Sequence, residues 1–255
     1  MQVTTVTLFR FRGFWMRFWA FRQMVLAYGP LRTTPGLRFV KVLGTGRGRG
    51  FHPAPNWGVY SILATWESRD DAERALAGDG KIGEYRDRSV EHYTLYLEAT
   101  RCHGTWDGIE PFEPALGAPS PAPLGVLTRA TIRPSRLWAF WRSVPAVSAM
   151  VAGQAPLRLS LGLGERPIVG LMTFSLWDDG DSMRSYAYRA GEHRETMRLA
   201  KRDGWFAEDL FVRFRVIDAA GLWEGECPFA IAQAAHAAPD AERPAPVEAA
   251  ALGAG

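Results

Sequence analysis

Apolar and polar residues alternate with period two in several short stretches, and apolar residues recur at helical spacing between them. In the first part of the chain this pattern predicts four strands and two helices, at residues 3–9, 14–28, 37–43, 59–66, 70–77 and 92–97. Ser68 is the expected N-cap of the second helix, and Gly29-Pro30 is expected to end the first. The resulting β-α-β-β-α-β order is typical of a ferredoxin-like unit.

The first predicted helix carries two apolar stripes. The residues expected to face the core are Phe14, Phe18, Phe21 and Val25. The second stripe lies beside arginines and comprises Trp15, Trp19 and Leu26, with Arg12, Arg17 and Arg22 as neighbours. Trp and Arg together suit a lipid headgroup interface or an entrance for an apolar substrate. A helix buried on both sides and a contact between oligomer subunits are equally open interpretations.

The second part of the chain repeats the first in collinear order. Residues 17–21 match 136–140, residues 60–66 match 170–177, and residues 91–97 match 208–214. The repeat predicts strands near 126–132, 157–163, 168–176 and 209–217 and helices near 135–151 and 180–202. We therefore predict an α+β fold in which two ferredoxin-like halves form a fused dimeric barrel, hollow enough to hold a flat ligand between sheet and helices.

Proline and alanine content sets the predicted boundaries. The first ferredoxin-like half covers 1–105, a Pro-rich linker covers 106–123, and the second half covers 124–225. From residue 226 to 255 the chain is dominated by Ala and Pro and is expected to be a disordered tail with at most a short Ala-rich helix. The second half has a longer segment before its last strand, which includes residues 191–198 and is expected to hold its specialised site.

The composition indicates the cellular compartment of the protein and the kinds of partner it could bind. No apolar window is long enough for a transmembrane helix, arginines interrupt any signal-peptide core, and two cysteines among 255 residues favour a reducing cytoplasm. Residues 1–50 contain eight Arg, one Lys and no Asp or Glu. Such a segment is attracted to nucleic acid or acidic lipid, or forms a solvated basic face. No nucleic-acid-binding motif accompanies it, so we expect no nucleic-acid partner.

The histidines and cysteines exclude most metal sites. None of the five His pairs at i, i+3 or i, i+4, and no Cys-x-x-Cys occurs, which argues against di-iron, zinc-ribbon and iron–sulfur sites. His193 and Glu195 match part of an iron facial triad, but a second His is missing. A b-type haem needs only one axial His and a pocket. His193 is the candidate ligand, and His92 is the second choice.

The surroundings of His193 suit a porphyrin. Met197 shares its helical face, and Trp205 and Phe206 are aromatic residues that can flank the ring. The basic residues that can pair the haem propionates are Arg194, Arg198 and Lys201, of which Arg198 is the leading candidate. The competing interpretation is that His193 is an ordinary surface residue of a helix.

Several sequence strings together resemble the spheroidene monooxygenase family, the acyclic carotenoid 2-ketolases of purple phototrophic bacteria. They are Thr-Leu-Phe-Arg-Phe at 7–11, Trp-Ala-Phe-Arg-Gln-Met at 19–24, Gly-Leu-Arg-Phe-Val-Lys at 36–41, Pro-Asn at 55–56, Tyr-Ser-Ile-Leu-Ala-Thr-Trp at 60–66 and the run at 204–214. The resemblance covers about residues 1–220 and leaves the Ala/Pro tail outside.

This resemblance implies a monooxygenase of carotenoid biosynthesis that contains haem b and uses dioxygen and reduced ferredoxin. It would oxidise C2 of spheroidene, and of hydroxyspheroidene, twice to give the 2-keto product spheroidenone. Its substrate would be collected from a membrane, so peripheral association with the intracytoplasmic membrane, like oligomer formation, is compatible with a cytoplasmic protein. The alternative is a non-enzymatic protein that binds haem or another apolar ligand on the same barrel.

Overall fold

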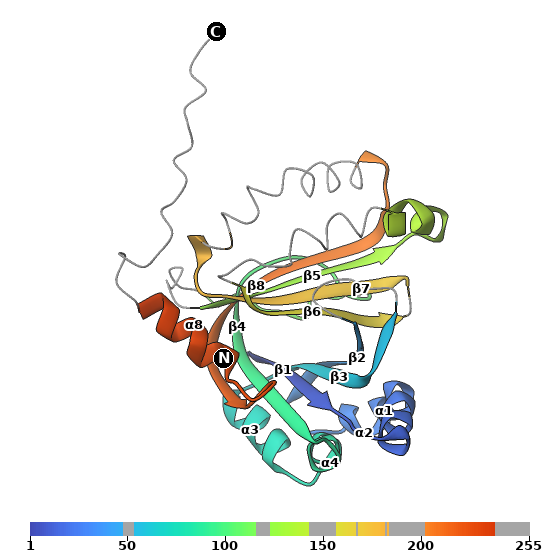
Figure 1. The fold of residues 1–255 in the computed structure, drawn as a ribbon. Coiled ribbons are helices and arrows are strands. Elements are labelled where there is room, and N and C mark those ends of the chain that lie inside the picture. Colours follow the sequence, from blue (N-terminus) through green and yellow to red (C-terminus); the bar gives the residue numbers. More distant parts are fainter. Residues whose placement is uncertain are drawn as a thin grey trace.

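Eight strands close into one antiparallel barrel, in the order β1-β3-β2-β6-β7-β5-β8-β4 (Figure 1). The structure is a computed structural model that describes residues 1–47, 54–115, 123–142, 157–166, 168–181, 183 and 202–237. The strands are β1 (Val3–Arg10), β2 (Leu37–Gly46), β3 (Pro55–Trp66), β4 (Glu91–Gly104), β5 (Leu124–Ile132), β6 (Leu157–Arg166), β7 (Gly170–Trp177) and β8 (Phe206–Gly221). Each predicted strand is therefore present, and β4 and β8 extend well past their predicted ends.

The two halves of the barrel repeat one strand order and one pairing register. β4-β1-β3-β2 and β8-β5-β7-β6 are the same permutation, and the barrel closes where β2 pairs with β6 and β4 pairs with β8. Trp66 of β3 lies opposite Val3 and Leu37, as Trp177 of β7 lies opposite Leu124 and Leu157. This shared register makes each position of the first half comparable with one position of the second.

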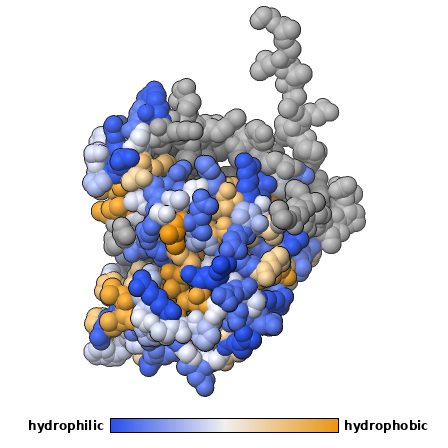
Figure 2. All heavy atoms as spheres, turned by 180° about the vertical axis from the view of Figure 1, so that it is seen from behind, coloured by the Kyte–Doolittle hydropathy of each residue, from blue (hydrophilic) through white to orange (hydrophobic). Residues whose placement is uncertain are grey.

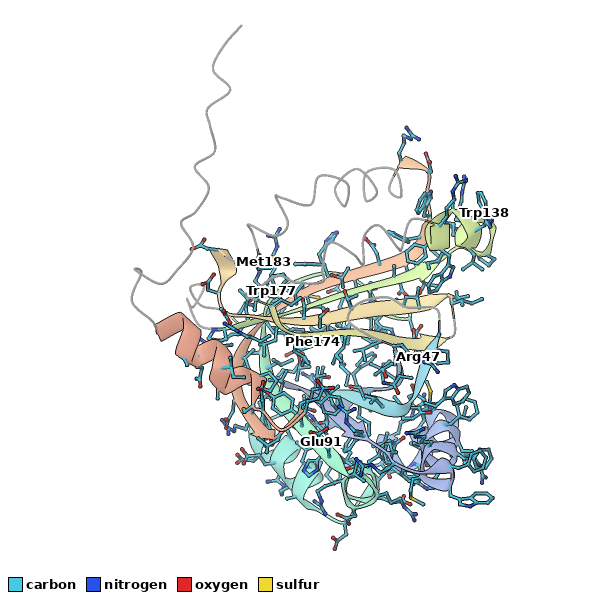
Figure 3. All side chains as sticks on the ribbon, viewed as in Figure 1. Arg47, Glu91, Trp138, Phe174, Trp177 and Met183 are labelled. Atoms are coloured by element: carbon cyan, nitrogen blue, oxygen red, sulfur yellow. The ribbon has the colours of Figure 1, made fainter. Side chains whose placement is uncertain are left out.

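Side chains from both halves fill the interior of the barrel. Alternation along the strands points one set of residues inward, where Leu8, Leu63, Phe174 and Phe214 are fully buried in one hydrophobic cluster. Phe174 lies on β7 between the two halves in Figure 3. Because the interior is occupied, space for a ligand has to lie on the outer faces of the barrel.

Helices cover the outer face of the first half. They are α1 (Phe14–Leu26), α2 (Tyr28–Arg32), α3 (Arg69–Ala77) and α4 (Lys81–Arg88). Ser68 caps α3 as predicted, because its hydroxyl accepts a hydrogen bond from the Asp71 amide at 3.2 Å. The prediction that Gly29-Pro30 ends the helix is wrong, since the chain turns at Ala27 and both residues lie inside α2. Proline is tolerated there because it lies in the first turn.

The prediction for the core face of α1 is also wrong. Phe14 and Val25 are 71% and 76% exposed, and Phe18 and Phe21 are exposed as well. The face that packs on the sheet instead carries the small Ala20 and the buried Gln23. Aromatic residues just after β1, on β3 and on α4 already fill the space beneath α1, so the phenylalanines of the helix turn outward. These sheet-side residues are Phe11, Tyr60 and Tyr85.

In the second half, Pro134–Arg136 forms a 3-10 turn after β5, and residues 137–142 continue it as a helix. The remainder of the helix predicted at 135–151 lies outside the described residues. Of the helix predicted at 180–202, the described residues 180, 181, 183 and 202 are helical.

Two segments of low sequence complexity contribute large residues to the core. In the predicted linker, Trp106 and Phe112 are buried in the barrel core, so residues 106–115 are part of the packed structure. In the predicted tail, α8 (Pro228–Ala237) is the short Ala-rich helix, and it buries Phe229 and Ala232 and contacts β6, β7 and β8. The tail therefore contains the short Ala-rich helix that the sequence allowed, and this helix packs on the barrel. In both segments a few large apolar residues cause the chain to pack on the barrel, although Pro and Ala dominate the surrounding sequence.

Candidate functional site

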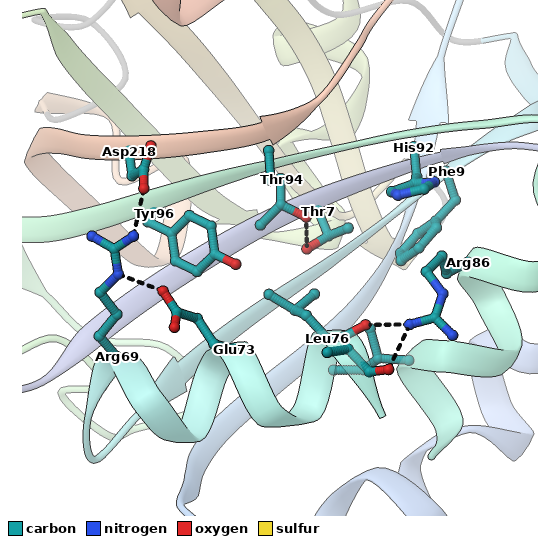
Figure 4. Close-up of a pocket in the computed structure, with 13 residues that line it drawn as sticks. Thr7, Phe9, Arg69, Glu73, Leu76, Arg86, His92, Thr94, Tyr96 and Asp218 are labelled. Carbon is teal, nitrogen blue, oxygen red and sulfur yellow. Dashed lines mark hydrogen bonds and ion pairs between the residues drawn. The ribbon is translucent and has the colours of Figure 1, made fainter. Parts of the chain in front are cut away.

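The outer face of the first half carries a pocket of about 430 Å³ between the sheet and helices α3 and α4 (Figure 4). The Thr94 hydroxyl donates to the Thr7 hydroxyl at 3.1 Å on its sheet side. At one end Arg69 pairs with Glu73 at 2.6 Å and with Asp218. At this end one guanidinium lies between two carboxylates, so the cation is fully paired and one net negative charge remains.

His92 lies at the rim of the same pocket, at the start of β4. Partial burial lowers the pKa of His92, and the nearby Arg86 guanidinium lowers it further. The imidazole is therefore neutral at pH 7, which leaves a nitrogen lone pair available. Arg86 itself donates to the carbonyl oxygens of Leu76 and Ala77 at 2.8 and 2.9 Å.

The outer face of the second half differs from the first in side-chain size. By register, Gly162 stands where the first half has Val42, and Thr173 stands where it has Ile62. Ser160 replaces Val40 and Ala130 replaces Phe9 in the same way. In the first half these outward positions belong to the cluster that packs under the helices. Along β5, β6 and β7 the outward side chains of the second sheet therefore project less far than their counterparts in the first half, and we call this the small-residue surface.

An apolar cluster borders these small residues. It consists of Leu124, Val126, Leu157 and Trp177, with Met183 and Phe211 packed against it. Figure 3 shows Trp177 and Met183 close together at one end of the second sheet. Because Met183 contacts this outward-facing cluster, the chain that connects β7 to β8 begins against the apolar cluster that borders the small residues.

The residues predicted to hold haem lie in that connection. His193, Arg194, Met197, Arg198 and Lys201 are outside the described residues. Trp205 and Phe206 are described: Trp205 is buried, and the centre of the Phe206 ring lies 6.4 Å from that of Phe140.

A buried network of charged side chains joins the two halves at one end of the barrel. Arg129 of β5 is 1% exposed and pairs with Glu165 at 2.8 Å and with Glu208 at 2.6 Å. Lys41 of the first half reaches Glu165 at 2.9 Å and also pairs with Asp107. The Arg129 guanidinium lies 5.0 Å from the centre of the Trp106 ring. Sequence reasoning missed this network because its members are far apart in the chain.

Two carboxylates of this network, Glu208 and Glu165, stay ionised. Burial acts to raise the pKa of Glu208, but hydrogen bonds from the Gly108 amide, the Thr105 hydroxyl and Arg129 outweigh it and lower the pKa to about 2. Burial likewise opposes ionisation of Glu165, yet Arg129 and Lys41 hold its pKa below the ordinary value. Each charged group has an oppositely charged partner within the network, so we assign the network to holding the barrel closed and not to chemistry.

Among the residues that the structure describes, no group of three or more His, Cys, Asp and Glu side chains could hold a metal ion. Within the same ranges, every helix is too short or too polar to cross a membrane.

The fold places the chain among α+β barrel proteins. An aldoxime dehydratase solved in complex with butyraldoxime matches it with a TM-score of 0.57 and 10% identity, over 85% of this chain and 80% of that one. At this identity the likeness concerns the fold alone. No protein-family model matches the sequence.

Sequence relatives define the family more closely. Spheroidene monooxygenase of Cereibacter sphaeroides is 38% identical over 98% of this chain and 78% of its own length. The Rhodobacter capsulatus enzyme of that name is 38% identical over 90% and 96%, and the Rubrivivax gelatinosus enzyme is 33% identical over 82% and 80%. The chain belongs to the spheroidene monooxygenase family, and is thus a monooxygenase among the oxidoreductases. The predicted resemblance is confirmed.

Proposed function

We propose that this protein is a haem-dependent monooxygenase that oxidises C2 of acyclic carotenoids, spheroidene and hydroxyspheroidene among them. Family membership supports a monooxygenase over a non-enzymatic binding protein. The structural observation that carries the haem site is the second sheet, where Gly162, Ser160 and Thr173 replace larger residues of the first half. A flat ligand fits against such a surface.

We also propose that each half of the barrel is a ferredoxin-like unit, because the two halves share one strand order and one pairing register.

His193 and Arg198 would hold the haem b in this proposal. The connection that carries them follows β7, where Met183 packs against the apolar cluster beside the small residues, and it leads into β8. His193 would bind the haem iron through its imidazole, and Arg198 would pair with a propionate. When bound, haem supplies activation of dioxygen, which the acid–base side chains of this chain cannot provide.

The remaining side chains have to orient an apolar chain end and exclude water. The cluster of Leu124, Val126, Leu157, Trp177 and Phe211 beside the small residues provides an apolar wall of this kind. Two successive oxidations would convert a CH₂ group to CHOH and then to a gem-diol, which loses water to give the ketone. Each oxidation consumes one O₂, two electrons and two protons and releases one water, and reduced ferredoxin would deliver the electrons one at a time.

The test of this function is the pigment made by cells that produce spheroidene. Expression of the protein should convert yellow spheroidene to red spheroidenone, identified by its absorption spectrum and by a mass gain of one oxygen with loss of two hydrogens. The same protein, purified and supplied with haem, should show a Soret band. Unchanged pigment from cells that contain the folded protein would refute the ketolase proposal, whereas haem transfer without turnover would favour a carrier.

Filling the small-residue surface should abolish haem binding. The double variant Gly162→Val and Thr173→Ile gives the second sheet the residues that the first half has at these positions. We expect loss of the Soret band and of ketolase activity with the fold retained, because the first sheet accommodates the same side chains. Thr173→Ser is the matched control, since it keeps the surface small. Normal haem binding by the double variant would place the haem elsewhere.

A further inference from the structure

An exposed face of aromatic and aliphatic residues interspersed with arginines occurs at one edge of the barrel. We call it the aromatic-basic face. Its apolar residues are Phe14, Trp15, Phe18, Phe21, Val25 and Leu26 of α1, Trp57 of β3 and Trp138 after β5. Figure 3 shows Trp138 projecting from the same edge at which Figure 1 places α1, and Figure 2 shows hydrophobic residues gathered along this edge from behind.

The aromatic side chains of this face contact one another and not the core. The rings of Phe14 and Phe18 are stacked with centres 6.3 Å apart, and the Phe21 ring centre lies 5.0 Å from that of Trp57. Trp15 and Trp138 are 73% and 74% exposed. Large exposed apolar patches are uncommon on monomeric proteins and mark binding surfaces.

The sequence segments that form this face carry positively charged side chains and no negatively charged ones. Residues 1–66 and 114–164, which contain α1, Trp57 and Trp138, include no Asp or Glu. Arg12 and Arg22 are exposed and form no ion pair with any described carboxylate. In the second half the Arg142 guanidinium lies 5.2 Å from the centre of the Trp138 ring, and Arg142 is itself exposed. Exposed arginines therefore accompany exposed tryptophans in both halves of the barrel.

We propose that the aromatic-basic face docks on the surface of an anionic lipid bilayer. Trp and Phe are suited to the headgroup level of a membrane, where their rings contact acyl chains, and arginines attract acidic lipids. The two halves present separate segments at one edge, and a soft bilayer can contact both at once. A second copy of this chain fits less well, because arginines would then face arginines. Docking would bring the proposed ketolase to its substrate, since a carotenoid is dissolved in a membrane. In this respect the inference rests on the proposed function.

Flotation with vesicles tests this docking without turnover. The full-length protein should float with phosphatidylcholine vesicles that contain phosphatidylglycerol, much less with phosphatidylcholine alone, and less at high salt. The variant Trp15→Ser with Phe18→Ser should bind at least about tenfold more weakly. Arg12→Gln with Arg22→Gln should bind about thirtyfold more weakly. All four side chains are exposed, so circular dichroism should show an unchanged fold.

Leu222→Ser and Arg101→Gln are the matched controls, because both residues are exposed and lie outside the aromatic-basic face. Their vesicle binding should equal that of the wild type. Equal binding by the face variants, or no preference for anionic vesicles, would overturn the proposal. The proposal would also be overturned if the protein bound no vesicles and instead formed an oligomer that the Trp15→Ser and Phe18→Ser changes dissociate. Vesicle binding without pigment conversion would leave the docking intact and refute only the proposed ketolase activity.

Discussion

His193→Ala should lose both the Soret band and the conversion of spheroidene. In the proposed site, His193 would hold the haem iron, and no other residue of the β7–β8 connection is a histidine. Loss of residues that merely support a metal ligand costs about 10–100-fold in affinity, so loss of the ligand itself should cost about 100-fold or more. Haem titration followed by absorption measures the affinity, and pigment extraction measures the activity.

His92→Ala is the matched control for this experiment. His92 is also an accessible neutral imidazole, but it lies on the first half at the rim of the pocket in Figure 4. Its replacement should leave both the Soret band and the pigment unchanged. A normal band in His193→Ala would refute the assignment, and a band lost in His92→Ala would move the ligand to the first half. Imidazole added to His193→Ala should restore part of the band, because the rest of the proposed haem site is unchanged.

Arg129→Met should destabilise the fold by about 3–5 kcal/mol, because it removes one partner from a buried network of charges. Glu165 and Glu208 each lose a hydrogen bond to the Arg129 guanidinium, and Glu165 is left with Lys41. Urea unfolding followed by circular dichroism measures the change. Arg38→Met is the control, because Arg38 and Glu113 form an exposed pair at 2.6 Å whose loss should cost less than about 1 kcal/mol.

The same network predicts how stability changes with acid. The folded pKa of Glu208 is about 2 and lies below its ordinary value of 4.5, so this carboxylate stabilises the fold fully above pH 4.5. Its contribution is lost as the pH falls from about 4.5 towards 2. Without Arg129 the pKa of Glu208 should rise, and acid unfolding of Arg129→Met should begin at higher pH. An unchanged acid transition, or a loss of stability no greater than that of Arg38→Met, would contradict this role.

The sequence predicted the strands well because alternation is a local property of the chain. Apolar patterns located the four strands of the first half, and the internal repeat located the four strands of the second. The match of residues 60–66 with 170–177 also anticipated the equivalent registers of Trp66 and Trp177. The outward turn of Phe14 and Val25 was not predictable in this way. Helical spacing identifies a stripe of residues but not the direction it faces, and the aromatic residues under α1 decided that direction.

What the sequence by itself determined is the position of each strand, the internal repeat and the family, since each is written in patterns that neighbouring residues share. Tertiary structure alone decided that the barrel interior is filled, that Arg129 pairs with Glu165 and Glu208, and that Gly162 and Thr173 form a shallow outer surface. These features bring together residues that are distant along the chain. Their energies depend on burial and mutual distance, which are set only when the strands pair and the barrel closes.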